Sequence, residues 1–189
     1  MPNWCANSLK LIATTPESEA KLSEIVRELA RATAANESAA IFNLIKPVPQ
    51  ALQIVSGFLG DDAEQAALEE AGKKNLDIYG YKNWYDYCVA EWGTKWDASE
   101  ATYDLDGNQV TIYFDTAWSP PMGIYHALEN MGFKVEATYV EQGMGYIGYY
   151  RDGRDTCEDL NLDDDDSYAQ VDHFFTEAGI THSPMHMGG

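Results

Sequence analysis

The sequence predicts an α+β fold, in which an antiparallel sheet has helices packed on one face around a ferredoxin-like core. Segments with strand and helix patterns follow one another as strand, helix, strand, helices, strand, strand, helix, strand, strand. The order strand-helix-strand-strand-helix-strand, which defines a ferredoxin-like core, is embedded in this series. The length of 189 residues fits one domain that can bury a hydrophobic core.

The N-terminal elements are a strand over residues 6–13 and a helix over residues 16–34. Thr15 is a suitable N-cap residue, and Pro16 suits the first helical position because its missing N–H would be unpaired there anyway. Apolar side chains at helical spacing give this helix one buried face: Leu22, Ile25, Val26 and Leu29.

The middle of the chain is less regular. The apolar run at 41–45 predicts a short strand, and residues 63–72 predict a short helix. Residues 84–92 place aromatic side chains on one helical face, and Gly93 fits the position that ends a helix.

The elements that follow are better defined. Residues 102–105 and 109–114 predict a hairpin, because Asp106-Gly107 between them favours a tight turn. A helix is expected from the double proline at 120–121 to Met131, followed by strands at 133–140 and 146–150. These elements complete a predicted domain over residues 1–151, followed by an acidic extension over 152–189 with one short helix near 168–178.

Charge is strongly unbalanced. Twelve basic and 31 acidic residues give a net charge of −19. Residues 1–96 carry 9 basic and 13 acidic residues, a net −4, whereas residues 97–189 carry 3 and 18, a net −15. Such a surface repels phosphate backbones, so we expect no direct nucleic-acid binding and instead a partner with a basic surface. The alternative is that the acidity only keeps the protein in solution.

Cysteine usage indicates a reducing compartment. Cys5, Cys88 and Cys157 are far apart, so the pattern predicts neither a disulfide framework nor a thiolate metal site. The N-terminal sequence lacks the pattern of a signal peptide, and no apolar run is long enough for a membrane helix. We therefore expect a cytoplasmic protein without membrane contact, cofactor or bound metal.

Three motifs have structural interpretations that we favour over chemical ones. Residues 143–148 spell G-x-G-x-x-G, but the strand-like sequence after them predicts a glycine-rich hairpin rather than a dinucleotide site. Residues 104–108 lack the later ligands of a calcium loop, so a hairpin turn is expected. The His and Met side chains at 182–187 suit copper(I) or nickel, although a short terminal tail is expected to be unstructured.

The acidic extension is the first candidate interaction site. Its carboxylates at short spacing can imitate a phosphate ladder, or they can form a plain solvated segment. The candidate partner-binding residues are Asp155, Glu158, Asp159, Asp163, Asp164, Asp165, Asp166 and Asp172.

The tryptophans form the second candidate site. Trp92 and Trp118 are expected to be largely buried and structural, with neighbouring polar residues pairing their indole N–H groups. The alternative is an exposed aromatic patch with a ligand pocket lined by Trp92, Trp118 and Glu141. Glu141 precedes a glycine-rich turn, where it either stabilises the turn or acts as a general base.

Five segments in order resemble the YubB ferredoxin-like family of uncharacterised plasmid, prophage and phage proteins. They are Met1–Asn7, Pro47–Pro49, Asn83–Trp96 in part, Phe114–Pro121 and Tyr139–Gly145. The resemblance covers roughly residues 1–150 and implies a ferredoxin-like fold and a mobile-element origin. It implies no iron–sulfur chemistry, because the cysteines cannot form a cluster site.

No catalytic motif was found, so an enzyme is not expected. Our leading hypothesis is an acidic, non-catalytic interaction protein from a mobile element. It would inhibit a host nucleic-acid enzyme or defence complex, possibly by nucleic-acid mimicry. The alternative is a small-molecule or peptide-binding module that uses the tryptophan and glycine motifs without mimicry.

Overall fold

The computed structural model describes residues 3–160, 167–182 and 184. The strands are β1 (Trp4–Ala13), β2 (Ser99–Asp106), β3 (Gln109–Ala117), β4 (Phe133–Glu141), β5 (Tyr146–Arg151) and β6 (Arg154–Asp159). The helices are α1 (Pro16–Ala35), α2 (Ile41–Ile45), η1 (Gln50–Leu52), α3 (Asp62–Tyr79), α4 (Trp84–Glu91), α5 (Met122–Asn130) and α6 (Ser167–Glu177).

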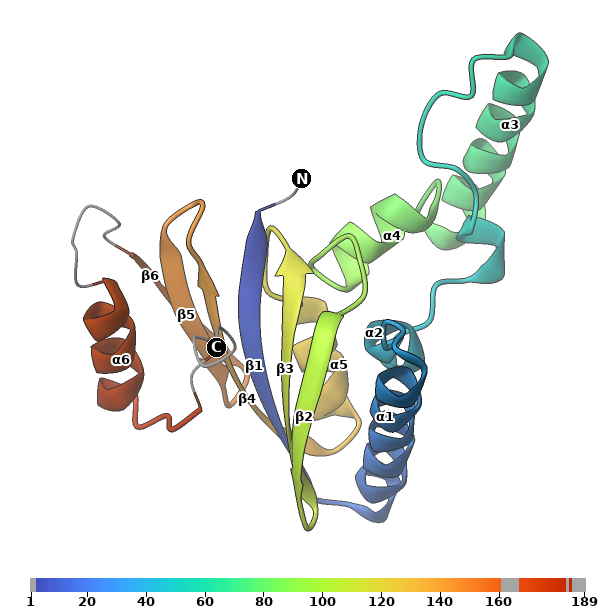
Figure 1. Ribbon diagram of the computed structural model, residues 1–189. Helices are drawn as coiled ribbons and strands as arrows, with labels where there is room; N and C mark the ends of the chain where they lie inside the picture. The colour runs from blue at the N-terminus through green and yellow to red at the C-terminus, as the bar shows by residue number, and fades with distance from the viewer. Residues whose placement is uncertain (1–2, 161–166, 183, 185–189) are drawn as a thin grey trace.

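The strands form one antiparallel sheet in the order β2-β3-β1-β4-β5-β6 (Figure 1). The series β1-α1-β2-β3-α5-β4 with the spatial order β2-β3-β1-β4 is the ferredoxin-like arrangement. The predicted α+β class and ferredoxin-like core are therefore confirmed. Helices α2 to α4 are inserted between α1 and β2, while β5, β6 and α6 extend the sheet beyond β4.

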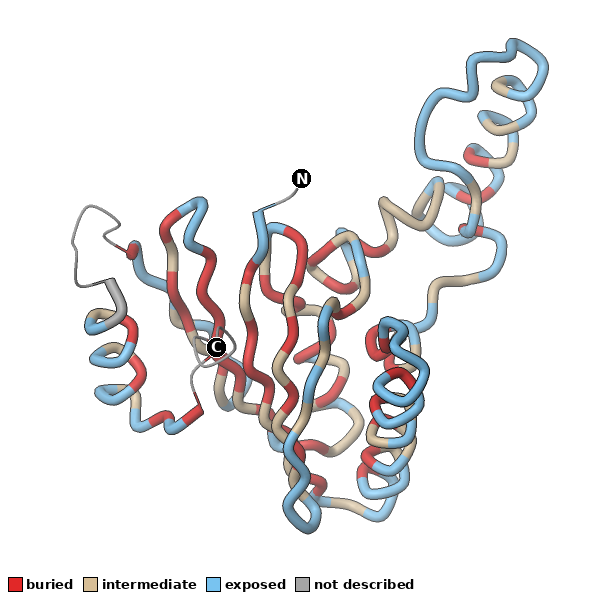
Figure 2. The backbone as a smooth tube through the Cα atoms, in the orientation of Figure 1, coloured by how far each residue is buried: buried red, intermediate tan, exposed pale blue. Residues whose placement is uncertain are grey.

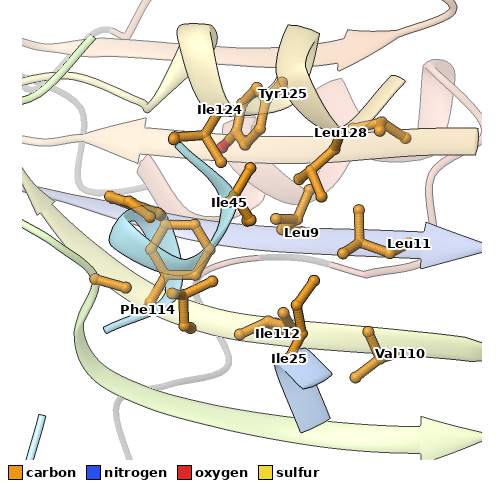
Figure 3. Packing of buried hydrophobic residues seen from close by; sticks show 14 of the residues in the cluster. Leu9, Leu11, Ile25, Ile45, Val110, Ile112, Phe114, Ile124, Tyr125 and Leu128 are labelled. Carbon is orange, nitrogen blue, oxygen red and sulfur yellow. The ribbon is translucent and has the colours of Figure 1, made fainter. Parts of the chain in front are cut away.

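The main hydrophobic core lies between the sheet and the helices α1, α2, α4 and α5. Leu9 of β1 pairs with Ile112 of β3 on one side and Ala137 of β4 on the other. Ile25 of α1 and Leu128 of α5 are fully buried in the same cluster (Figure 3). The two helices expected to share one face of the sheet do so.

Helix α6 covers the opposite face over β4 and β5. Because side chains alternate along a strand, Val140 points away from the face that holds Ala137. Val140 and Ile147 pack with Val171 and Phe175 of α6 in a second, smaller cluster. Figure 2 shows the inward stripe of buried residues along α6.

A buried histidine fastens the chain after α6 to the sheet. His182, expected in an unstructured tail, is only 7% exposed. Its ring nitrogens contact the Ser8 hydroxyl at 2.9 Å and the Glu136 carboxylate at 3.0 Å, and its carbonyl accepts from Thr138. Met185 and His186, the next residues of the motif after Pro184, lie outside the described residues.

The predicted strand over residues 41–45 is wrong, because this segment is helix α2. Asp97, far along the chain, accepts hydrogen bonds from the backbone N–H groups of Phe42 at 2.8 Å and Asn43 at 2.9 Å. Burial raises the pKa of Asp97, although these amides act in the opposite direction. The carboxylate thus pairs free amides at the start of the helix, an interaction that local sequence does not reveal.

The helix expected at 63–72 is longer, and it projects from the body as α3 (Figure 1). Asp61 caps its start by accepting from two backbone N–H groups, and Gly80 ends it with a left-handed φ of 80°. Its exposed side chains weaken the apolar periodicity from which a helix is predicted.

Strand β6 was not predicted. Its sequence, Arg-Asp-Thr-Cys-Glu-Asp, has almost every side chain exposed, so no alternation marks it. The boundary placed after Arg151 falls in the turn of the β5–β6 hairpin, where Arg151 pairs with Arg154. None of the described helices is both long and apolar enough to span a membrane.

Candidate binding site

The segments with the most distinctive motifs meet at one end of the sheet. Strand β1 begins there, and β3 and β4 end there, so Cys5 pairs with Thr116 on one side and Glu141 on the other. The loop after α4 joins them, because the Ser119 hydroxyl donates to the Gly93 carbonyl at 2.6 Å. Residues more than a hundred positions apart therefore meet at this end of the sheet.

A fully buried asparagine organises the interior of this end. The Asn7 amide donates to the Cys5 carbonyl at 2.7 Å and to the Thr116 hydroxyl at 2.9 Å. Its side-chain oxygen accepts from the Tyr125 hydroxyl at 3.3 Å. Because its donors and acceptor are paired inside the protein, this network positions β1, β3 and α5 relative to one another.

The thiol at this end is not an activated nucleophile. Cys5 is completely buried, and burial raises the pKa of its thiol to about 12. A cysteine nucleophile reacts as its thiolate, which this environment disfavours.

Glu141 closes the turn between β4 and β5. Its carboxylate is 1% exposed and accepts from the backbone N–H groups of Gly143 at 2.8 Å and Met144 at 2.5 Å. A Cβ at Gly143 would lie 2.4 Å from the Asn3 amide nitrogen, so a larger residue there would displace the Asn3 side chain. The G-x-G-x-x-G sequence is thus a hairpin, and Glu141 has the turn-stabilising role rather than an open position for acid–base chemistry.

Trp92 is buried as predicted. Its side chain is 4% exposed, its indole N–H donates to the Lys46 carbonyl at 2.8 Å, and its ring meets Phe42 edge to face at 5.8 Å. This tryptophan belongs to the core.

The prediction that Trp118 is largely buried is wrong, because its side chain is 42% exposed. Its backbone has a left-handed φ of 71°, which is unusual for a bulky residue. Its N–H donates to the Asn3 carbonyl, and its carbonyl accepts from the Tyr146 hydroxyl at 2.6 Å. Backbone contacts therefore hold this residue in a conformation that leaves its ring at the surface.

Two other tryptophans are exposed beside it. Trp4 and Trp96 are 41% and 40% exposed, with ring centroids 6.1 Å apart. The Lys95 ammonium lies 3.7 Å from the centroid of Trp96 and 4.1 Å from that of Trp118. We call Trp4, Lys95, Trp96 and Trp118 the tryptophan face.

A groove of about 290 Å³ adjoins the tryptophan face and shares two of its residues. Its lining is Asn43, Val48, Gln53, Trp84, Cys88, Trp92, Lys95, Trp96 and Asp97. Trp92 forms part of this lining, whereas neither Trp118 nor Glu141 does. The three residues proposed to line one pocket therefore lie apart from one another. Trp92 lines the groove, Trp118 belongs to the tryptophan face, and Glu141 closes the turn between β4 and β5.

The acidic candidates occupy several settings. Glu158 and Asp159 are exposed on the edge strand β6, and Asp172 is exposed on α6. Asp155 accepts a hydrogen bond from the buried Tyr139 hydroxyl at 2.6 Å, so it has a structural contact. The run Asp163, Asp164, Asp165 and Asp166 lies outside the described residues.

The Tyr139–Asp155 contact crosses β5 at Gly148. A Cβ there would lie 2.2 Å from the Tyr139 ring and 2.6 Å from the Thr156 carbonyl. Glycine therefore leaves the space through which the tyrosine reaches β6.

In the described part of the chain, no three His, Cys, Asp or Glu side chains cluster in a way that could hold a metal ion. The segment considered as a calcium loop forms the β2–β3 hairpin, with Gly107 at φ 60°.

One comparison with known protein families points to the same fold. Residues 91–179 match a family model described as the ferredoxin-like domain in Api92-like protein. The similarity is to a ferredoxin-like domain. A crystal structure of a protein api92 from Yersinia pseudotuberculosis is 12% identical with a TM-score of 0.44, covering 86% of this chain and 99% of that one. No curated protein matches. None of these matches concerns the YubB family or a mobile-element origin.

Proposed function

We propose that this chain is a non-catalytic binding protein and that the tryptophan face is its main contact surface. The observation that carries this proposal is the exposure of Trp4, Trp96 and Trp118, brought together from three separate segments. Tryptophan is enriched among the residues that dominate binding energy. The left-handed backbone of Trp118 adds support, because strained residues concentrate at functional sites.

The neighbouring polar groups support binding rather than catalysis. The side chains of Asn7 and Glu141 are hydrogen-bonded within the protein, and the Cys5 thiol is held protonated. A catalytic site needs a polar group directed at the substrate, whereas these groups hold the scaffold together.

The test compares two pairs of exposed aromatic residues. The double variant Trp96→Ala and Trp118→Ala alters the tryptophan face, and Phe58→Ala with Tyr79→Ala is the control on and beside α3. Immobilised parent and variants are exposed to a bacterial lysate, and bound proteins and small molecules are quantified by mass spectrometry. We expect the first variant to lose specific binding while melting close to the parent, and the control to retain binding. Undiminished binding by the first variant would refute the proposal.

A second candidate function is supported by the position of the acidic extension. In this proposal the extension binds the basic surface of a host nucleic-acid enzyme or defence complex in the bacterial cytoplasm, and a mobile element encodes the chain. Glu158 and Asp159 stand on a strand paired to the sheet, so their charges are presented by a fixed scaffold. The sequence from 152 to 189 contains only one Lys or Arg, Arg154. Charges on an edge strand also prevent pairing with other chains, which needs no partner.

Two variants that each lose three negative charges distinguish binding of a basic partner from mere protection of the sheet edge. The test variant is Glu158→Gln, Asp159→Asn and Asp172→Asn; the control variant is Glu70→Gln, Asp77→Asn and Asp104→Asn. Both remove three exposed charges, and Asp155 is kept because of its contact with Tyr139. A companion variant changes the four aspartates at 163–166 to asparagine.

With a basic partner identified by capture, we expect slower association for the test variant and the companion variant but not for the control. The difference should shrink as salt rises, and DNA or RNA should compete. Equal rates for all variants without such competition would leave the extension as solubilising surface only.

A further inference from the structure

The groove beside Trp96 has an apolar floor, and three of its polar neighbours are already paired. The Trp92 indole N–H donates to Lys46, the Asn43 side-chain oxygen accepts from Val48, and the Asp97 carboxylate accepts backbone amides. None of these groups needs a ligand. The floor therefore favours an apolar body of modest size, since ligand sites are mostly apolar with a few directed polar groups.

Lys95 supplies one directed polar group at the groove. Lys21 and Lys46 pair with Glu24 and Glu91. Among the described residues, by contrast, the Lys95 ammonium has no carboxylate partner, and its contacts are the two indole rings. These rings hold the ammonium in place beside the groove, while its N–H donors are available to an acceptor.

We infer that the groove binds an apolar group of about the size of an aromatic ring that carries one carboxylate, with Lys95 pairing the carboxylate. The inference rests on the proposed binding function and names its ligand chemistry. The volume of about 290 Å³ suits such a group. A phosphate dianion fits less well, because the net charge of −19 repels a doubly charged ligand more than a monoanion. A free carboxylic acid and the C-terminus of a partner chain share the required chemistry.

The experiment uses two matched pairs of probes. One pair is 4-phenylbutyrate and 4-phenylbutyramide; the other is a short peptide ending in phenylalanine, with a free or an amidated C-terminus. Binding is followed by the indole N–H signals of the full chain labelled with nitrogen-15 at tryptophan. We expect saturable shifts of the Trp84, Trp92 and Trp96 signals with the acids, and about three- to tenfold weaker binding of the amides.

Two lysine variants test the charge. Lys95→Met keeps an unbranched side chain and removes the ammonium, and Lys134→Met is the control because Lys134 is exposed at the opposite end of β4. We expect Lys95→Met to bind acid and amide equally, and Lys134→Met to keep the preference for the acid. Binding of only the peptide acid supports a chain end as the source of the carboxylate, and binding of 4-phenylbutyrate supports a free acid.

Failure of this inference is distinguishable from failure of the proposed function. If neither acid shifts the groove signals in a saturable manner, or if Lys95→Met keeps the preference for the acid, the inference is overturned. The Trp96→Ala, Trp118→Ala variant then still decides whether the tryptophan face binds a different molecule.

Discussion

The two faces of the sheet are closed in different ways. Helices α1, α2, α4 and α5 cover one face with a continuous hydrophobic cluster that includes Leu9, Ile112 and Leu128. Helix α6 covers part of the other face with a smaller cluster, and His182 adds polar contacts to Ser8 and Glu136. Burial of apolar area is the main stabilising contribution to a fold, so the first face determines global stability.

The smaller face is therefore expected to open by itself. Local opening has a lower free energy where few apolar contacts are buried, and it proceeds without unfolding of the rest. Asp172 of the acidic extension lies on α6 and so belongs to the smaller face.

The largest expected effect on stability is that of Trp92→Ala, in the hydrophobic cluster under α1, α2, α4 and α5. The variant leaves a cavity beside Phe42 and an unpaired Lys46 carbonyl. We expect a loss of about 3–5 kcal/mol in the free energy of unfolding. Chemical denaturation of parent and variant measures it, and a loss below about 1 kcal/mol would show that this face is not the principal core.

The next effect is that of Phe175→Ala on the smaller face. Phe175 is 2% exposed in the α6 cluster, and its truncation is expected to remove about 3 kcal/mol from the free energy of local opening. Hydrogen exchange should accelerate in α6, with little change in α1 and α5. Equal acceleration in all three helices would show that the two faces unfold together.

A smaller effect is expected when the pH is lowered, because protonation of His182 weakens the docking of its segment on the sheet. Burial lowers the pKa of His182 below its usual value of about 6.5; the Glu136 carboxylate opposes this, while Lys10 and Arg151 reinforce it. Above pH 6.5 the ring is neutral whether docked or free, and docking has its full strength. As the pH falls below 6.5, the free segment gains a proton that the docked ring resists, so docking weakens until the docked ring is also protonated.

Hydrogen exchange of α6 at pH 7.5 and 5.5, corrected for intrinsic rates, measures this dependence. In His182→Gln the difference between the two pH values should shrink, whereas His173→Gln, which alters the exposed imidazole of α6, should behave as the parent. A parent whose α6 protection is the same at both pH values would contradict the expected shift.

The smallest effect concerns Trp118→Gly. Glycine adopts the left-handed conformation at φ 71° without strain, whereas removal of the ring loses its contact with Lys95; because the two effects oppose each other, stability should change by less than about 1 kcal/mol. Binding at the tryptophan face should nevertheless fall. Thermal melting and ligand titration of the same variant measure the two properties, and a strongly destabilised variant would show that the exposed ring is structural.

The candidate site was only partly predictable. Asn3, Trp4, Trp96 and Lys95 lie in motifs that the sequence analysis singled out, but the adjacency of Lys95 to Trp118 was not foreseen. It depends on the loops after α4 and β3 meeting at the end of the sheet, a long-range contact without a local signal. The exposure of Trp118 was missed for the same reason, because it follows from backbone contacts with Asn3 and Tyr146.

The sequence by itself determined the elements whose own residues carry a strong pattern. Helix α1 has its Thr15 cap and apolar stripe, and the β2–β3 hairpin has its glycine turn, so both appear where periodicity and turn chemistry place them. Only the tertiary structure decided α2, where Asp97 pairs helical amides from a distance, and β6, where backbone pairing with β5 organises a sequence without alternation. Local patterns report burial along a single element, whereas these two depend on hydrogen bonds supplied by another part of the chain.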